Sequence, residues 1–265
     1  MKKIFLAALF ISVMAFGMNS FAGTPGVIIP DSVKESMGTH PGPLGLNVRP
    51  MAPGPQIMAS AGEAKTVMVD DIAVPAEATV VVTLKCGKND SAGILKLFKK
   101  TEAEDGSVSF KQILVSNATL GKNGLYKEKE GDNKTPVGVF KMNTPMGIKS
   151  ALSGFPENYL KVNDTHYWNG DSVSSRYNKL VSTDDYSNFR TSESEHIVDY
   201  PGYYNYCIDS GYNYDGEPYR GSAIFLHCQV DGQTTHGCIA IPENDMIEVM
   251  RNYAEGSTYM AIAEK

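Results

Sequence analysis

The amino-acid sequence predicts a mainly β fold with few helices. From about residue 66 onward, short runs rich in β-branched and aromatic residues recur, separated by clusters of turn-forming residues. Amphipathic periodicity of the helical kind is scarce. Together these observations indicate the fold class.

The expected elements follow one another along the chain. Glu104-Asp105-Gly106-Ser107 is a hairpin signal between two of the expected strands. One helix is expected after Pro242, because Met246, Val249, Met250 and Tyr253 fall at helical spacing and acidic Glu243 and Asp245 lie in its first turn. The expected strands cover residues 66–69, 79–84, 93–98, 110–115, 137–142, 203–208, 222–227 and 239–241.

Residues 146–194 form a long irregular insertion rich in Tyr, Asn, Asp and Ser. Loops of this length in a compact domain are often lids or binding walls. Aromatic side chains among amides and carboxylates suit a ligand that contains sugar or peptide. The alternative is that the aromatic side chains only anchor a large loop to the core, and the sequence leaves both open.

The N-terminal third divides into two segments of different character. Residues 1–22 are expected to be a secretory signal peptide, because two lysines precede an apolar run that ends in Ser20-Phe21-Ala22. Residues 23–65 are rich in Pro and Gly and are expected to be a linker or arm. Residues 66–265 are then expected to be the main folded domain. We therefore expect an exported protein without a stable membrane span after signal cleavage.

The charge of the chain excludes some classes of partner. The net charge is −6, and signal cleavage would leave 22 basic against 30 acidic residues, a net charge of −8. Nucleic acid is not an expected partner, because sequence-independent binding needs a basic face. Nothing indicates an anionic membrane partner either, and the oligomeric state is not predicted.

Cysteine usage is sparse for an exported chain, with Cys86, Cys207, Cys228 and Cys238. If Cys238 stays reduced, at most two of the others can pair. Cys207 and Cys228 lie in strand-like runs and are either cross-strand partners or two free buried thiols. Their disulfide state stays open.

The most informative segment runs from His227 to Cys238. A thiol attacks as its thiolate, and a nearby His can take its proton. Asp231-Gly232 is a turn signal between two apolar runs, so the chain can fold back and bring His227 beside Cys238. A purely structural role is the simple alternative. Zinc is disfavoured, because His227 and Cys228 should point to opposite faces of a strand.

With these residues in view, the chain resembles the L,D-transpeptidase catalytic-domain family of bacterial cell-wall enzymes from about residue 80 to the C-terminus. The resemblance implies a β-sandwich or roll. It rests on Gly121-Lys122-Asn123-Gly124 with residues 129–140, on Tyr167-Trp168, Asp171-Ser172 and Tyr177-Asn178, on residues 194–197, and on residues 220–227 with Thr235-His236-Gly237-Cys238-Ile239-Ala240-Ile241.

The resemblance implies the roles of five residues. Cys238 matches the nucleophile and His227 the base, while Thr235, His236 and Gly237 adjoin the oxyanion or substrate site. The thiolate would attack a tetrapeptide stem of peptidoglycan, release D-alanine and form a thioester, with backbone amides near Gly237 and Cys238 holding the oxyanion. An amine from another stem then gives a 3→3 cross-link. No metal or organic cofactor is required.

Two departures and several alternatives accompany the resemblance. The spacing from His227 to Cys238 is shorter than in the best-known members, and Ala240 stands where many carry an Arg that would meet a substrate carboxylate. The same site used with water would make an L,D-carboxypeptidase, and a non-catalytic wall-binding module is the other alternative. A papain-like protease is disfavoured by the order of His and Cys.

Overall fold

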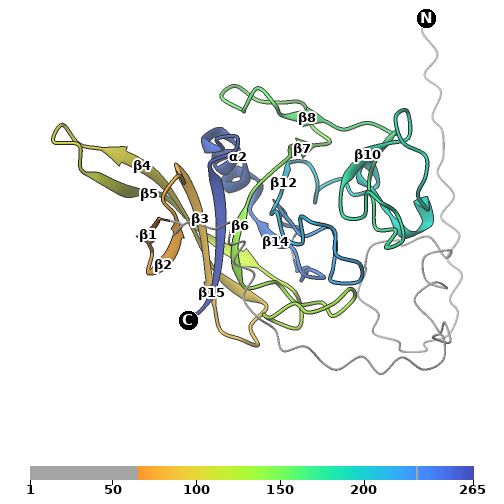
Figure 1. Cartoon of the computed structure of the whole chain (residues 1–265), viewed down its shortest axis with the longest axis horizontal. Coiled ribbons are helices and arrows are strands. Elements are labelled where there is room, and N and C mark those ends of the chain that lie inside the picture. The colour runs from red at the N-terminus through yellow and green to blue at the C-terminus, as the bar shows by residue number, and fades with distance from the viewer. Residues whose placement is uncertain (1–64, 231) are drawn as a thin grey trace, which may run out of the picture. The chain divides into compact units, whose positions relative to one another are not determined.

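The computed structural model describes residues 65–230 and 232–265, and the expected signal peptide and nearly all of the expected arm lie outside them. The described part is mainly β, as predicted (Figure 1). Its strands are β1 (Thr66–Val69), β2 (Ile72–Pro75), β3 (Val80–Cys86), β4 (Ala92–Glu102), β5 (Val108–Thr119), β6 (Gly138–Lys141), β7 (Pro145–Gly147), β8 (Leu160–Lys161), β9 (His166–Trp168), β10 (Leu180–Ser182), β11 (Glu195–His196), β12 (Cys207–Asp209), β13 (Phe225–Cys228), β14 (Ile239–Ile241) and β15 (Thr258–Glu264). Its helices are the 3-10 helices η1 (Thr191–Glu193) and η2 (Ile197–Asp199) and the α-helix α2 (Glu243–Asn252).

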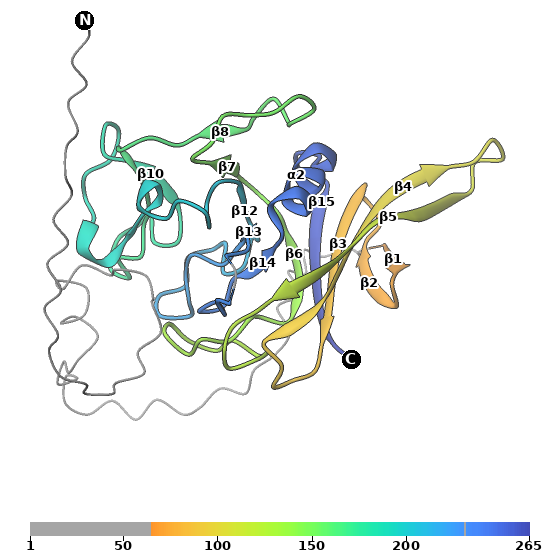
Figure 2. The same ribbon diagram turned by 180° about the vertical axis from the view of Figure 1, so that it is seen from behind.

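One curled sheet organises the described residues. Ten strands follow one another in the order β6-β15-β3-β4-β5-β14-β13-β12-β7-β8. Most pairs are antiparallel, but β15 with β3, β13 with β14 and β7 with β8 are parallel. Strands β12, β13 and β14 lie side by side, so the two halves of the predicted site come from adjacent strands (Figure 2).

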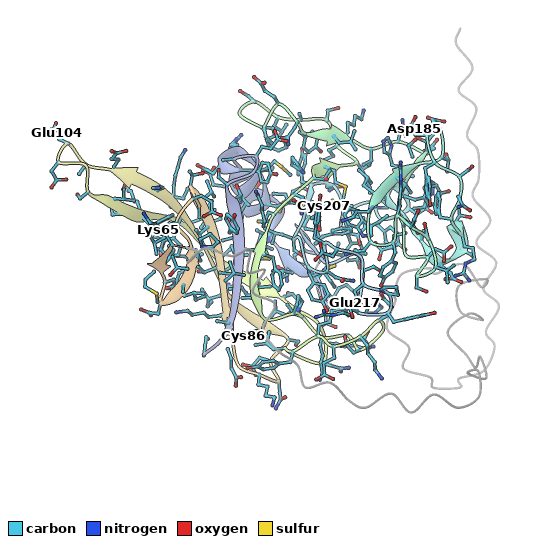
Figure 3. All side chains as sticks on the ribbon, viewed as in Figure 1. Lys65, Cys86, Glu104, Asp185, Cys207 and Glu217 are labelled. Atoms are coloured by element: carbon cyan, nitrogen blue, oxygen red, sulfur yellow. The ribbon has the colours of Figure 1, made fainter. Side chains whose placement is uncertain are left out.

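The predicted hairpin and helix are both present. The hairpin β4–β5 turns through residues 103–107, where Gly106 has φ +78° and Ala103 N–H donates to the Ser107 carbonyl. Its tip projects freely, with Glu104 at the end (Figure 3). Helix α2 buries Met246, Val249 and Met250, as its periodicity predicts, and contacts β5 and β13.

Strand alternation divides the buried side chains into clusters. In β3, Val80, Val82 and Leu84 enter the main cluster with α2, whereas Val81 faces a cluster beneath the β1–β2 hairpin. A further cluster lies on the other face of β12–β14, below the small sheet β10-β9-β11. Strands β9 and β10 of that small sheet, β8 and η1 lie within the long insertion of residues 146–194, and β11 directly follows it. The rest of the insertion is mostly irregular, as expected.

Two expected strands begin several residues later in the structure than the sequence predicts. Residues 203–206 and 222–224 precede β12 and β13 in non-strand conformations, and Ala223 has φ +53°. The β-propensity of these runs is overridden by packing around the site. No helix among the described residues is long and apolar enough to cross a membrane.

The four cysteines are free and buried. Cys207 is paired in register with His227, so it points to the opposite face from Cys228. Of the two alternatives for this pair, the structure has two free buried thiols.

Candidate active site

Strand alternation places the two candidate catalytic residues on one face of the sheet. In the parallel pair β13–β14, His227 lies opposite Ala240. Cys238 precedes Ala240 by two positions and therefore shares the face of His227. Cys228 points the other way, into the main core, as strand alternation predicts. The two candidates thus share a face, with His227 in β13 and Cys238 directly before β14.

The Cys238 thiol is buried and hydrogen-bonded in the resting structure. Its side chain is 9% exposed. The S–H donates to the Ala223 carbonyl, with a sulfur–oxygen distance of 3.0 Å, and the Phe225 N–H approaches the sulfur at 3.4 Å. Burial, followed by the nearby charge of Glu195, raises the thiol pKa to about 12. The candidate nucleophile is therefore held as a neutral thiol.

The tautomer of His227 suits a general base. Its Nδ1 lies 2.8 Å from the Cys228 carbonyl oxygen, which can only accept, so Nδ1 carries the proton of the neutral ring. Nε2 is then the basic nitrogen. The ring packs edge-on to Tyr203 and Tyr204, and burial lowers its pKa to about 4. At neutral pH His227 is an uncharged imidazole with a free lone pair.

The fold-back expected between His227 and Cys238 takes a different form. The turn is present, since the Gln233 N–H donates to the Val230 carbonyl and Gly232 has φ +73°. The flanking strands run parallel, however, so the loop is a crossover and not a hairpin. Strand spacing and rise put the Cα atoms of His227 and Cys238 roughly 8 Å apart.

No hydrogen bond joins these two side chains in the described part of the chain. An activated cysteine is expected to have a lowered thiol pKa, whereas burial raises the pKa of Cys238. Both groups are desolvated and neutral, so a nucleophilic role for Cys238 would require its proton to pass to His227 as it attacks a substrate.

Thr235 and Gly237 shape the turn before the nucleophile. Thr235 Oγ1 accepts from the Gly237 N–H at 3.1 Å and donates to the Cys238 carbonyl at 2.7 Å. Gly237 has φ +140°, and a Cβ there would lie 2.7 Å from the Lys134 carbonyl oxygen. The Gly237 amide is thus committed within the turn, which leaves the Cys238 amide as the better candidate for the oxyanion.

His236 lies at the exposed rim of this turn and forms no hydrogen bond with Cys238 among the described residues. Partial enclosure, together with the positive charges of Lys122 and Lys127, lowers its pKa. This position suits contact with substrate better than proton transfer at the sulfur.

The glycine-rich entry segment holds the nucleophile turn in place. The fully buried Thr135 hydroxyl accepts from the Gly121 N–H at 3.0 Å and donates to the Gly237 carbonyl at 2.9 Å. In the same segment Lys127 pairs with Asp132 at 2.9 Å, with both side chains almost entirely buried. Sequence reasoning matched this segment to a family but did not single out Thr135.

Asn178 is a further residue that sequence reasoning did not assign to the site. Its Oδ1 accepts from the Trp168 indole N–H at 2.8 Å and from the Ala223 N–H at 3.0 Å. Its Nδ2 donates to the carbonyls of Tyr212 and Asn213. Asn178 therefore fixes the left-handed Ala223, whose carbonyl accepts the thiol proton. Only the Tyr177-Asn178 match gave a signal for it.

Glu195 is a third residue near the Cys238 thiol that sequence reasoning did not assign to the site. Its Oε2 accepts from the Tyr204 hydroxyl at 2.7 Å. Burial raises the carboxyl pKa to about 7. The Glu195-His196 pair stood out in sequence only as the approach to a strand.

Comparison with known proteins decides the family. The family model described as YkuD, L,D-transpeptidase catalytic domain, matches residues 99–261, which is more than half of the chain. The chain belongs to the L,D-transpeptidase catalytic domain family. The matched range includes all five predicted site residues. The mainly β architecture of the structure agrees with the fold class expected from the resemblance. No individual curated protein matches the chain.

Family membership supports a catalytic function of the L,D-transpeptidase type in the bacterial cell wall. The family is one of cell-wall enzymes acting on peptidoglycan. The individual roles of Cys238, His227, Thr235, His236 and Gly237 are taken up below as proposals.

Proposed function

We propose that the protein is a peptidoglycan L,D-transpeptidase that uses Cys238 as its nucleophile. The thiolate attacks a tetrapeptide stem, D-alanine leaves, and an amine of a second stem resolves the thioester into a 3→3 cross-link. The observation that carries this proposal is the pairing of a buried thiol with a histidine whose Nδ1 is tied to a carbonyl, on one face of adjacent strands.

His227 acts as the general base in this scheme. As substrate enters, the thiol proton passes from its hydrogen bond with Ala223 to Nε2 of His227, and the sulfur attacks the carbonyl carbon. The Cys238 amide, aided by the open backbone at Gly237, stabilises the oxyanion. Thr235 shapes the turn, and His236 lines the substrate approach. The protonated His227 then supplies a proton to the departing D-alanine.

The proposal extends to where the protein works and to its domains. Residues 1–22 would direct export to the periplasm or cell wall, residues 23–65 would be a linker or arm, and the catalytic domain would begin at residue 66. Peptidoglycan stem peptides are the proposed partners. A cell-wall enzyme family and the basic, apolar and small-residue pattern of the N-terminus support this arrangement.

Mass spectrometry of purified disaccharide-tetrapeptide tests the reaction. The protein and its Cys238→Ala variant are each incubated with this donor. The substitution removes one buried sulfur and should lower the free energy of unfolding by only about 1 kcal/mol, so the variant should still fold. A dimer that lacks one D-alanine, seen only with Cys238 present, is the expected result. Tripeptide without dimer would identify a carboxypeptidase, and equal turnover by the variant would remove Cys238 from the mechanism.

A further inference from the structure

Glu195 lies on the wall that covers the nucleophile. Strand β11 pairs with β9, which places Glu195 opposite Trp168. The Trp168 ring packs edge-on to Phe225 at 4.8 Å between centroids, and the Phe225 N–H approaches the Cys238 sulfur. The small sheet therefore brings a carboxylate to the same side of the molecule as the thiol.

The partner of this carboxylate is a neutral group. Tyr204 donates to Glu195 Oε2, and its ring packs edge-on to Phe225 and His227 at 5.4 and 5.5 Å. Asp132, Asp171 and Glu243 have cationic partners, namely Lys127, Arg190 and Lys149. Glu130, like Glu195, instead accepts hydrogen bonds from neutral hydroxyl groups, those of Tyr177 and Ser222. No Lys, Arg or His within residues 65–230 and 232–265 forms an ion pair with Glu195.

An unpaired carboxylate at this place opposes the first half of the reaction. The titratable groups that sense Glu195 are Cys238, Cys207, Tyr200 and Tyr204, and Glu130 acts on Glu195 itself; all are neutral or anionic. Its charge disfavours the Cys238 thiolate. A glutamine would accept the same hydrogen bond from Tyr204, so packing alone does not require the negative charge.

We propose that Glu195 recognises the protonated primary amine of the acyl acceptor and receives its first proton. This inference rests on the proposed function and concerns its second half. The free amine reaches the enzyme as an ammonium ion, and a carboxylate with no cationic partner attracts that ion in preference to water. Glu195 thereby favours cross-linking over hydrolysis of the thioester.

The protons of the second half-reaction balance in two steps. The ammonium gives one proton to Glu195, and the amine lone pair then attacks the thioester carbonyl. The carbon–sulfur bond breaks as the intermediate collapses. His227 takes the second proton from the new amide nitrogen and returns it to the Cys238 sulfur, while Glu195 releases its proton to solvent.

Competing nucleophiles of different charge test this role. The full chain is acylated with disaccharide-tetrapeptide at pH 8, where Glu195 is mostly ionised, in the presence of methylamine, which is a cation, or hydroxylamine, which is neutral. Mass spectrometry measures the ratio of methylamide or hydroxamate to hydrolysed tripeptide, and intact-protein mass measures the thioester. Glu195→Gln is compared with Glu193→Gln, which removes a carboxylate that pairs with Arg190 instead.

The expected result is selective. Glu195→Gln lowers the methylamide ratio about tenfold, the size of one lost charged hydrogen bond, and leaves the hydroxamate ratio unchanged. Glu193→Gln behaves as the wild type with both nucleophiles. Tyr204→Phe, which keeps the carboxylate, retains the preference for methylamine and so separates charge from packing.

Two results would overturn the inference without touching the proposed function. One is thioester formation with an unchanged methylamide ratio in Glu195→Gln, and the other is an equal fall for both nucleophiles, which marks a structural role. Absence of any thioester in the wild type would instead refute the proposed function and this inference together.

Discussion

At the scale of single residues, the proposed active site is a pair of desolvated, neutral side chains. Cys238 keeps its proton on the Ala223 carbonyl, and His227 keeps its lone pair on Nε2. Neither is charged near neutral pH, with pKa values of about 12 and 4. Such a site gains its nucleophile only when a bound substrate rearranges these hydrogen bonds, which limits side reactions of the free thiol.

The two histidines should differ sharply in importance. His227→Ala removes the proposed base on the face of Cys238 and should lower kcat/KM by roughly 10²–10⁴-fold. His236→Ala, at the exposed rim, should lower it by about tenfold or less and act mainly on KM. Steady-state turnover of disaccharide-tetrapeptide by both variants measures this. Equal and mild effects would contradict the assigned roles.

Gly237 should be sensitive for a reason that Gly232 lacks. Both have positive φ, but a Cβ at Gly237 would meet the Lys134 carbonyl and Ile224, whereas nothing lies within 4 Å at Gly232. Gly237→Ala should cost about 1–3 kcal/mol and displace the nucleophile turn, abolishing activity. Gly232→Ala should cost about 1 kcal/mol and remain active. Urea unfolding and turnover measure both, and similar losses in the two variants would argue against a close-approach requirement.

At the scale of elements, two segments distant in sequence build the nucleophile turn. The entry segment contacts the turn through Thr135, which donates to the Gly237 carbonyl. The insertion acts through Asn178, which fixes Ala223, and the Ala223 carbonyl accepts from the Cys238 thiol. These contacts span tens of residues of chain. Local sequence patterns therefore predict part of the strand set, with β15 among the strands that were not expected, but not the contacts that support the nucleophile turn.

Much of the fold was predictable because it rests on local signals. The β4–β5 hairpin follows from its turn residues, and α2 follows from its apolar spacing. The parallel pairing of β13 with β14 was not predictable, since it depends on where β5 and β12 lie. Likewise, residue spacing singled out Cys238 and His227 as candidates, but the resting hydrogen bonds of both depend on tertiary packing.

Removing the Thr135 hydroxyl tests the link between the two segments. Thr135→Val leaves the Gly121 amide and the Gly237 carbonyl without their buried partner, which should destabilise the fold by about 2–4 kcal/mol and reduce acylation of Cys238. Thr135→Ser keeps the hydroxyl and should retain most stability and activity. Denaturant unfolding with intact-mass detection of the thioester measures both effects. Full activity in Thr135→Val would disconnect this residue from the nucleophile turn.

At the scale of the whole molecule, buried ionisable groups make the free energy of unfolding depend on pH. Burial lowers the pKa of His227 from 6.5 to about 4, so its stabilising contribution is complete above pH 6.5 and is lost as the pH falls toward 4. Burial raises the pKa of Glu195 from 4.5 to about 7 and that of Asp209 from 3.8 to about 6. The contributions of Glu195 and Asp209 to the free energy of unfolding are fully present below their ordinary pKa values and are lost as the pH rises through about 7 and about 6. The opposing groups partly cancel between pH 4.5 and 6.5.

A comparison of wild type with Glu195→Gln isolates one of these groups, because His227 and Asp209 are common to both proteins. Near pH 5 the wild-type carboxyl is protonated and resembles the amide, so the two stabilities should be close. Near pH 8 the wild type carries an enclosed charge, and the variant should be the more stable by up to about 3 kcal/mol. Urea unfolding at both pH values measures this difference.

The control for this prediction is Glu193→Gln, whose carboxylate pairs with Arg190 and whose effect on stability should be the same at both pH values. A stability difference for Glu195→Gln that does not change between pH 5 and pH 8 would mean that Glu195 titrates as an ordinary carboxyl. In that case its charge would impose no cost on folding. If Glu195→Gln is more stable than the wild type at pH 8 and also loses the preference for methylamine, the negative charge of Glu195 lowers stability but favours the acceptor amine. Its presence would then be explained by function and not by folding.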